Sequence, residues 1–234
     1  MASNGIVSTP QPKRKLVAPL WHTLVLLAVS VALLWLQNRT LRSGGQHHGN
    51  VIHYLSVIIS EWALSFYVWL GGLIPGATRI RELVGGRWSG MRDVLRDIAI
   101  AAAFWVVFAG VGFLLDFLLK PSPPAGLGFV NPRGAVEVTL WVMMSITSGF
   151  CEELVFRGYL QKQFLALTGS AALAVLAQAV LFGCGHWYQG VKMVIVITVL
   201  GALFGILAHW RKSLRPGMIA HAWEDIASLI AIIT

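Results

Sequence analysis

The sequence predicts an all-α fold, a polytopic bundle of about seven transmembrane helices, and three observations lead to this prediction. Hydrophobic residues make up 56% of the 234 residues and charged residues only 12%, whereas soluble domains carry about 25% charged residues. Apolar runs of about 20 residues recur along the chain, which is the length that an α-helix needs to cross a bilayer. Lys and Arg are concentrated in the short segments between these runs.

Seven apolar runs follow a polar, basic tail at residues 1–15. The first run resembles a signal-peptide core but is too long for one and lacks a clear cleavage site, so we expect it to remain as a span. We divide the chain into the tail, three N-terminal spans within residues 16–135, and a C-terminal segment at residues 136–234. The predicted spans are Leu16–Leu36, Val51–Ile74, Val94–Leu119, Val136–Leu160, Ala171–Trp187, Val191–Trp210 and Met218–Ile233.

The distribution of positive charge predicts the orientation of the chain in the membrane. With a cytoplasmic N-terminus, thirteen of the 18 Lys and Arg residues fall on the inner side and five on the outer side. Because cytoplasmic loops carry an excess of Lys and Arg, we expect this orientation, in the plasma (inner) membrane. The net charge of +8 is explained by these loops and by anionic lipid, so we expect a lipid bilayer as a partner and no nucleic acid.

Ionisable residues inside the C-terminal spans are the candidates for chemistry, because a charged side chain in the membrane is costly and usually faces the bundle interior. Glu152 and Glu153 are adjacent in the fourth span, and Arg157 is placed one turn beyond Glu153 to pair with it. Glu152 is left without a local partner, and a carboxylate in an apolar site can act as a general base near neutral pH. His186 ends the fifth span.

A further pair is on the seventh span, where His221 and Asp225 share one helix face. Taken singly, these groups have ordinary alternatives: a structural ion pair, a helix-capping histidine, or the polar face of an amphipathic helix. Ionisable residues are energetically costly in the membrane, and here they occur on three separate spans. One interior site explains them most simply, so we predict that they converge. Their depths pose a difficulty, since Glu152 falls near the inner end of its predicted span and His186 near the outer end of its own.

Together the three groups resemble the signature motifs of the CPBP family, which joins type II CAAX prenyl endopeptidases with bacteriocin-processing and abortive-infection membrane proteins. The resemblance covers less than half of the chain, about Val138 to Ile230. The resemblance implies an intramembrane endopeptidase that cleaves a peptide or protein substrate, with residues 136–234 as its catalytic core. The matching motifs are Glu152-Glu153-x-x-x-Arg157, Phe182-x-x-x-His186 and His221-x-x-x-Asp225.

The resemblance also implies a role for each matched residue. Glu152 would be the general base that activates a water molecule, with His186 assisting it. Glu153 would be a supporting residue held by Arg157.

The roles of His221 and Asp225 are less specific, because the resemblance implies either oxyanion stabilisation or help in holding a metal. The CAAX enzymes often have Asn where Asp225 stands, and an ionised Asp cannot donate a hydrogen bond, which favours orienting or ligand chemistry there. By ligand type, zinc could be held by Glu152, His186, His221 and Asp225. The chain has no HExxH motif, and a metal-free mechanism remains an equal alternative.

Two other classes of function stay open. Intramembrane Glu and His residues also build proton relays, so a proton-coupled transporter is one alternative. It would require further polar residues in the first three spans, where Glu61 stands out either as a relay group or as the partner of an inward-facing donor. A non-catalytic membrane scaffold or immunity protein is the other. The substrate, its prenylation and the oligomeric state are not determined by the sequence.

Overall fold

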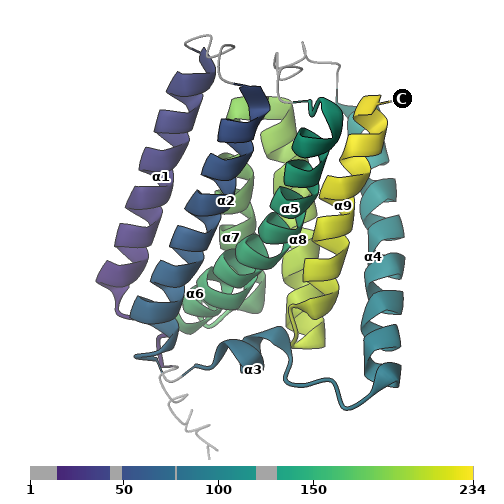
Figure 1. Cartoon of the computed structure of the whole chain (residues 1–234). Coiled ribbons are helices and arrows are strands. Elements are labelled where there is room, and N and C mark those ends of the chain that lie inside the picture. The colour runs from purple at the N-terminus through teal and green to yellow at the C-terminus, as the bar shows by residue number, and fades with distance from the viewer. Residues whose placement is uncertain (1–14, 43–48, 77, 120–130, 234) are drawn as a thin grey trace, which may run out of the picture.

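A computed structural model describes residues 15–42, 49–76, 78–119 and 131–233, and every regular element within them is a helix. This confirms the all-α prediction. Apart from Lys15, the predicted N-terminal tail lies outside the described residues. Most helices run roughly along one direction and form a single bundle (Figure 1). They are α1 (Leu20–Arg42), α2 (Gly49–Tyr67), η1 (Val68–Leu73), α3 (Ile80–Val84), α4 (Met91–Leu118), α5 (Gly134–Glu152), η3 (Glu153–Leu160), α6 (Gln161–Thr168), α7 (Ala171–Gly185), η4 (Trp187–Gln189), α8 (Val191–Arg211) and α9 (Arg215–Ile233).

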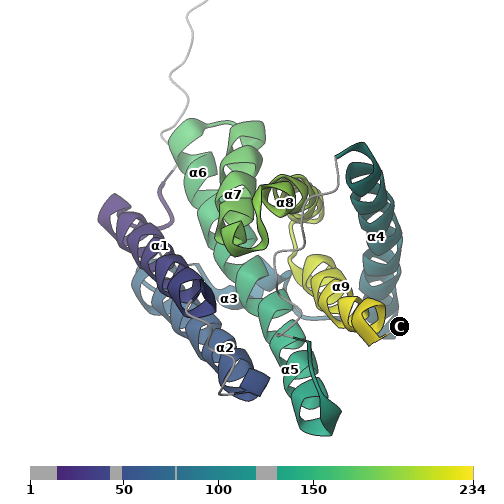
Figure 2. The same ribbon diagram turned by 90° about the horizontal axis from the view of Figure 1, so that it is seen from above.

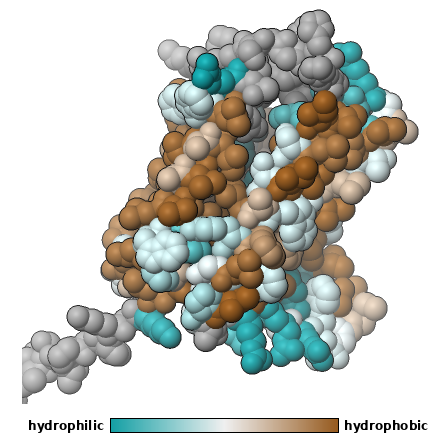
Figure 3. Space-filling model, turned by 60° about the vertical axis from the view of Figure 1, so that its left-hand side comes forward, coloured by the Kyte–Doolittle hydropathy of each residue, from teal (hydrophilic) through white to brown (hydrophobic). Residues whose placement is uncertain are grey.

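Each of the seven predicted spans corresponds to a helix, but the count of seven membrane crossings is not confirmed. Within the described ranges, four helical stretches are long and apolar enough to cross a membrane, at Asn50–Leu73, Met91–Leu118, Gly134–Thr168 and Val191–Arg211. The apolar parts of α1 and α7 are shorter. Large apolar side chains such as Phe113 and Phe117 are more than three-quarters exposed, as expected for helices that face lipid. Figure 3 shows hydrophobic residues over the middle of one face and hydrophilic residues toward its ends.

The fourth predicted span is part of a longer helix than the sequence suggested. The helical stretch Gly134–Thr168 has 35 residues and comprises α5, the π-helical η3 and α6. At about 1.5 Å per residue it is about 50 Å long, which exceeds the hydrocarbon core of about 30 Å. It therefore crosses the bundle obliquely (Figure 1). Glu152 lies near the middle of this 35-residue stretch, which reduces the expected difference in depth between Glu152 and His186.

Close helix contacts bring the motif-bearing segments together. Seen from above, α5 lies between α2 and α9, and α7 lies beside α8 (Figure 2). Gly149 permits the contact between α5 and α9, because a Cβ atom there would lie 2.8 Å from the carbonyl oxygen of Met218 and 2.9 Å from the amide nitrogen of Ala222. Small residues allow this kind of close approach between membrane helices. A larger residue at position 149 would separate the Glu152 region from α9.

Two apolar clusters flank the polar motifs. One gathers around η3 and includes Leu154 and Tyr159, with contributions from α1 and η1. The other joins α4, α8 and α9 and includes Phe108 and Phe204. The first cluster thus includes the chain neighbour of Glu153, and the second includes Phe204, whose ring lies beside both Arg157 and His221.

The start of α9 is held by a buried acid on α4. Asp97 is 1% exposed and accepts a hydrogen bond from the indole nitrogen of Trp88 at 2.9 Å. The Arg215 Nε atom lies 3.1 Å from its carboxylate, and the guanidinium groups of Arg96 and Arg211 lie within 3.8 Å. Because buried charges require partners, this arrangement fixes α4 against the α8–α9 connection.

The first helix is tied to η3 by a buried polar network. The Tyr159 hydroxyl hydrogen-bonds with His22 Nδ1 at 2.8 Å and with Thr23 Oγ1 at 2.9 Å. The side chain of Gln163 accepts hydrogen bonds from the backbone amides of Val17 and Ala18 and donates to the Ala18 carbonyl. The N-terminal helices therefore support the helix that carries the Glu and Arg motif.

Replacing Tyr159 with Phe is expected to lower the free energy of unfolding by about 1–3 kcal/mol, because two buried polar groups lose their shared partner. Thermal unfolding in detergent, followed by circular dichroism, measures this change. Tyr188→Phe is the matched control, since the Tyr188 hydroxyl accepts a hydrogen bond from its chain neighbour Gln189. Equal destabilisation by the two variants would show that the buried network contributes nothing specific.

Candidate active site

A fully buried ion pair forms the base of the candidate site. Arg157 Nη1 lies 2.9 Å from Glu153 Oε1, and both side chains are 0% exposed. The two residues are one turn apart on η3, as their spacing predicted. Partners are required because an unpaired charge in an apolar interior is very unfavourable. Glu153 and Arg157 therefore form a neutral unit in the protein interior.

Aromatic rings enclose the Arg157 guanidinium on faces that the carboxylate leaves open. Its central carbon lies 4.2 Å from the centroid of the Phe182 ring and 5.2 Å from that of Phe204. Arg157 Nη2 also donates a hydrogen bond to the Gly201 carbonyl oxygen at 3.1 Å. Cation–π contacts of this kind are strongest when desolvated. Phe204 and Gly201 were not predicted from the sequence, since neither carries a charge or belongs to a motif.

His221 of α9 joins the two adjacent glutamates. Its Nδ1 atom lies 3.2 Å from Glu153 Oε1, and its Nε2 atom lies 3.5 Å from Glu152 Oε2. Asp225 Oδ2 lies 4.0 Å from the same Nε2 atom. His221 thus has carboxylate oxygens beside both ring nitrogens, one of them from the buried ion pair.

Exposure differs sharply across this cluster. The Glu153 side chain is 0% exposed, whereas those of Glu152 and Asp225 are 20% and 34% exposed. The Nε2 side of His221 therefore faces the accessible part of the cluster, between two carboxylates. Water can reach the cluster from this side, whereas the Glu153 side chain is fully buried.

His186 is close to the cluster but is not in direct contact with it. Its Nδ1 atom hydrogen-bonds with the Phe182 carbonyl oxygen at 2.9 Å, and its ring packs against the Phe182 ring. The Phe182 ring in turn lies edge-on to His221, with centroids 6.0 Å apart. Within the described residues, His186 makes no hydrogen bond or ion pair with Glu152 or His221. The structure thus brings five of the six predicted residues into one contact network. The sixth, His186, is separated from His221 by the Phe182 ring.

Other polar residues near the motifs have partners that define their positions. Glu61 of α2 accepts a hydrogen bond from Ser148 of α5 at 2.8 Å. Ser148 was not predicted from the sequence, although it lies one turn before Glu152. Glu224 accepts a hydrogen bond from the Trp105 indole at 2.8 Å, so it faces α4 instead of the cluster.

The arrangement of these side chains does not fit a metal centre. Across the ranges that the structure describes, no group of three or more His, Cys, Asp or Glu residues is placed to hold a metal ion. His221 directs each ring nitrogen toward a carboxylate oxygen, and His186 uses Nδ1 on a backbone carbonyl. Zinc at Glu152, His186, His221 and Asp225 stays a prediction, and the reaction proposed for these residues uses no metal.

Comparison with protein families agrees with the motif resemblance. Residues 134–227 match the family model described as type II CAAX prenyl endopeptidase Rce1-like. This match supports membership of residues 134–227, here named the CPBP segment, in the CPBP family. The CPBP segment contains Glu152, Glu153, Arg157, His186, His221 and Asp225. It supports a CAAX-type intramembrane protease in general terms.

Other comparisons are more distant. In an alignment of 162 positions that covers 62% of this chain, the protein is 26% identical to a probable potassium transport system protein Kup from Rhodococcus jostii (strain RHA1). This alignment covers 23% of the Kup chain, so the present chain corresponds to about a quarter of that relative. No solved structure matches this chain.

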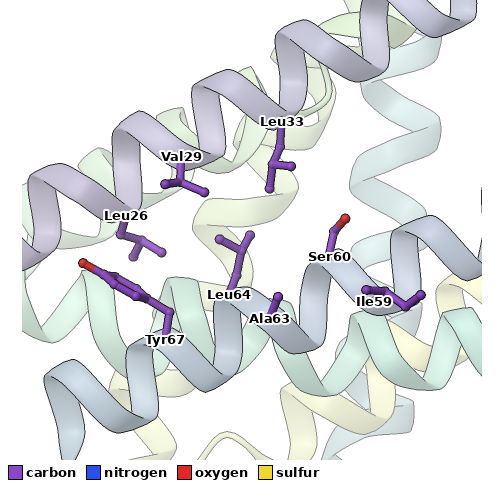
Figure 4. Close-up of a pocket in the computed structure, with 8 residues that line it drawn as sticks. All are labelled: Leu26, Val29, Leu33, Ile59, Ser60, Ala63, Leu64 and Tyr67. Carbon is purple, nitrogen blue, oxygen red and sulfur yellow. The ribbon is translucent and has the colours of Figure 1, made fainter.

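An apolar pocket lies apart from the CPBP segment, between α1 and α2. It has a volume of about 280 Å³ and is lined by apolar side chains such as Leu26, Val29 and Leu64, together with Ser60 and Tyr67. Figure 4 shows the α1 side chains directed toward those of α2 across this space. None of the six motif residues lines it.

Proposed function

We propose that this protein is an intramembrane endopeptidase in which Glu152 activates the water that hydrolyses a peptide bond. The observation that carries the proposal is the position of His221 between Glu152, Glu153 and Asp225. Two residues from the fourth predicted span and two from the seventh meet there. Such convergence of costly ionisable groups in a membrane protein is characteristic of function.

The proposed reaction assigns a proton position to each step. Glu152 takes a proton from water while the water oxygen attacks the carbonyl carbon of the scissile peptide bond. The C–N bond then breaks, and the proton passes from Glu152 to the leaving amine nitrogen, which yields a carboxylic acid and an amine. General base catalysis of this kind contributes about 10²–10⁴-fold to the rate.

His221 is proposed to stabilise the oxyanion that forms during the attack. Carboxylate oxygens beside both ring nitrogens favour an imidazolium with two N–H donors. The Nδ1–H group is held by Glu153, which leaves Nε2–H to face the accessible side. Asp225 would orient the ring, because an ionised carboxylate cannot itself donate to an oxyanion. The buried Arg157 neutralises Glu153 and keeps that carboxylate from competing for the reacting proton.

His186 is proposed to assist Glu152 from the edge of the active site. Its contact with Phe182 places it one ring from His221, and its Nδ1 atom is engaged by a backbone carbonyl. A substrate entering beside Glu152 would then lie near Nε2 of His186.

The membrane and the orientation of the chain form part of the proposal. Arg96, Arg211 and Arg215 gather around Asp97 at one end of the bundle. The positive charge of that end supports its placement at the cytoplasmic face of the plasma membrane, with the N-terminus inside.

The proposal is tested with purified protein in liposomes and a mixture of unmodified and S-farnesylated peptides, with cleavage products identified by mass spectrometry. Wild-type protein is expected to cleave members of the mixture. His221→Ala should reduce the rate by about 10²–10³-fold, the cost of losing one oxyanion donor. Glu224→Gln is the matched control, since Glu224 faces Trp105 on α4 and should be dispensable.

Two outcomes of this assay would contradict the proposal. One is full activity of His221→Ala, and the other is equal loss in His221→Ala and Glu224→Gln. A parallel reaction with 1,10-phenanthroline measures metal dependence. The farnesylated and unmodified members of the mixture report whether a prenyl group is required.

Ion transport is the second candidate function, because the aligned relative is a probable potassium transport protein. The same liposomes can be loaded with potassium salt and assayed for uptake of ⁸⁶Rb⁺ under a proton gradient. Uptake that survives Glu152→Ala, without any peptide cleavage by the wild-type protein, would favour transport over hydrolysis.

A further inference from the structure

Glu61 lies outside the CPBP segment, on α2, yet it faces the same part of the molecule as the predicted site residues. Its Oε1 atom accepts a hydrogen bond from the Ser148 hydroxyl at 2.8 Å. Ser148 is buried and lies one helical turn before Glu152, so the two side chains emerge from the same face of α5. Glu152, His221 and Asp225 lie near enough to Glu61 to act electrostatically on its carboxyl group. A helix of the N-terminal half thus brings a carboxyl group to the site.

The second carboxyl oxygen of Glu61 has no structural role that is visible in the fold. Glu61 Oε2 is buried and, within the described ranges, has no hydrogen-bond partner. A buried polar atom without a partner costs free energy, and the cost is larger for a charged group than for a neutral one. Helix packing alone would be satisfied by Ser148 and Oε1. The Oε2 atom therefore requires a partner of another kind, and water in the accessible part of the site can supply one.

We propose that Glu61 is a positioning residue of this site, in which Ser148 fixes one carboxyl oxygen and the other holds the attacking water for Glu152. This inference rests on the proposed hydrolytic function and extends it to a helix that the family segment does not include. Glu61 forms no bond to the substrate and accepts no proton from the water. The water donates its proton to Glu152, while Glu61 as a neutral acid donates a hydrogen bond to the water oxygen and limits its orientation.

The test compares Glu61→Ala with Glu61→Gln in liposomes, using the same mixture of unmodified and S-farnesylated peptides. Glu61→Ala is expected to lower kcat by about 10²-fold with KM nearly unchanged, because the water loses its orientation while substrate contacts remain. Glu61→Gln is expected to retain most of the activity, since the amide oxygen can accept from Ser148 and the amide N–H can still bind water. Trp62→Phe is the matched control, because the neighbouring Trp62 ring packs α2 against Phe150 of α5 without a polar contact to the site.

Several results would overturn the inference, and Glu152→Ala in the same assay separates them from failure of the proposed function. Full activity of Glu61→Ala, with Glu152→Ala inactive, would leave the hydrolase intact and remove Glu61 from it. Loss in Glu61→Gln as deep as in Glu61→Ala would show that a proton or charge is needed, which positioning by hydrogen bonds does not explain. An increase in KM alone would assign Glu61 to substrate binding.

If Glu61→Ala does not fold, Ser148→Ala takes its place. This variant removes only the hydroxyl that fixes Oε1, and an unchanged kcat would overturn the inference. If wild-type protein cleaves no peptide in the mixture, the proposed function fails and the inference fails with it.

Discussion

Replacing Glu152 with Ala is expected to reduce peptide cleavage by about 10²–10⁴-fold, the contribution of a well-placed general base. Glu152 Oε2 lies 3.5 Å from His221 Nε2, on the accessible side of the buried ion pair. Asp225, the other accessible carboxylate, lies farther from the same nitrogen atom, at 4.0 Å. The rate is measured with purified protein in liposomes under single-turnover conditions.

The folded state should survive this change, because the Glu152 side chain is 20% exposed and is not part of the Glu153–Arg157 pair. Glu152→Gln serves as the control for shape, since it keeps the size of the side chain and removes its basicity. Both variants should melt close to the wild-type temperature and both should be inactive. Cleavage by Glu152→Gln at the wild-type rate would eliminate Glu152 as the base. Absence of cleavage by the wild-type protein would instead favour a scaffold or immunity function.

Replacing Arg157 with Met is expected to destabilise the protein by about 3–5 kcal/mol, because it leaves the Glu153 carboxylate buried without its partner. Both side chains are 0% exposed, and no solvent is available to compensate for the lost charge. The variant also loses the contacts of the guanidinium with the Phe182 and Phe204 rings. Chemical unfolding in detergent, followed by tryptophan fluorescence, measures the change.

A double variant separates the loss of charge pairing from the loss of packing. Arg157→Met combined with Glu153→Gln removes both charges, so it should recover part of the stability that Arg157→Met loses. It should not recover activity, because His221 would lack the carboxylate that holds its Nδ1 atom. Equal stability of the single and double variants would show that the ion pair is not what stabilises this part of the protein.

The N-terminal helices have a defined structural relation to the CPBP segment, although the family match does not include them. Helix α1 is tied to η3 through Tyr159 and Gln163, and α2 is tied to α5 through Glu61 and Ser148. Truncation of these helices would expose buried polar groups on the helix that carries Glu153. We therefore regard the N-terminal half as part of the folded unit that supports the site.

The local pairings could be predicted because helical periodicity alone places residues four apart on one face. Glu153 with Arg157, and His221 with Asp225, are of this kind. The apolar runs likewise predicted a helical membrane protein, since lipid requires every backbone polar group to be paired within the segment. The boundaries were less certain, and α6 extends the fourth predicted span because its polar residues Gln161 and Gln163 are buried by neighbouring helices.

The sequence by itself determined the class of fold, the similarity of residues 134–227 to a known family and the ionisable residues that need an interior location, because these depend on composition and short-range spacing. Only the tertiary structure decided that His221 joins Glu152 to Glu153, that Phe182 separates His186 from His221, and that Glu61 approaches from α2. Those contacts depend on how close and at what angle the helices cross. Residues such as Gly149 allow the helices to approach closely because they have no side chain at the contact. No pattern of charge or hydropathy reveals such a contact.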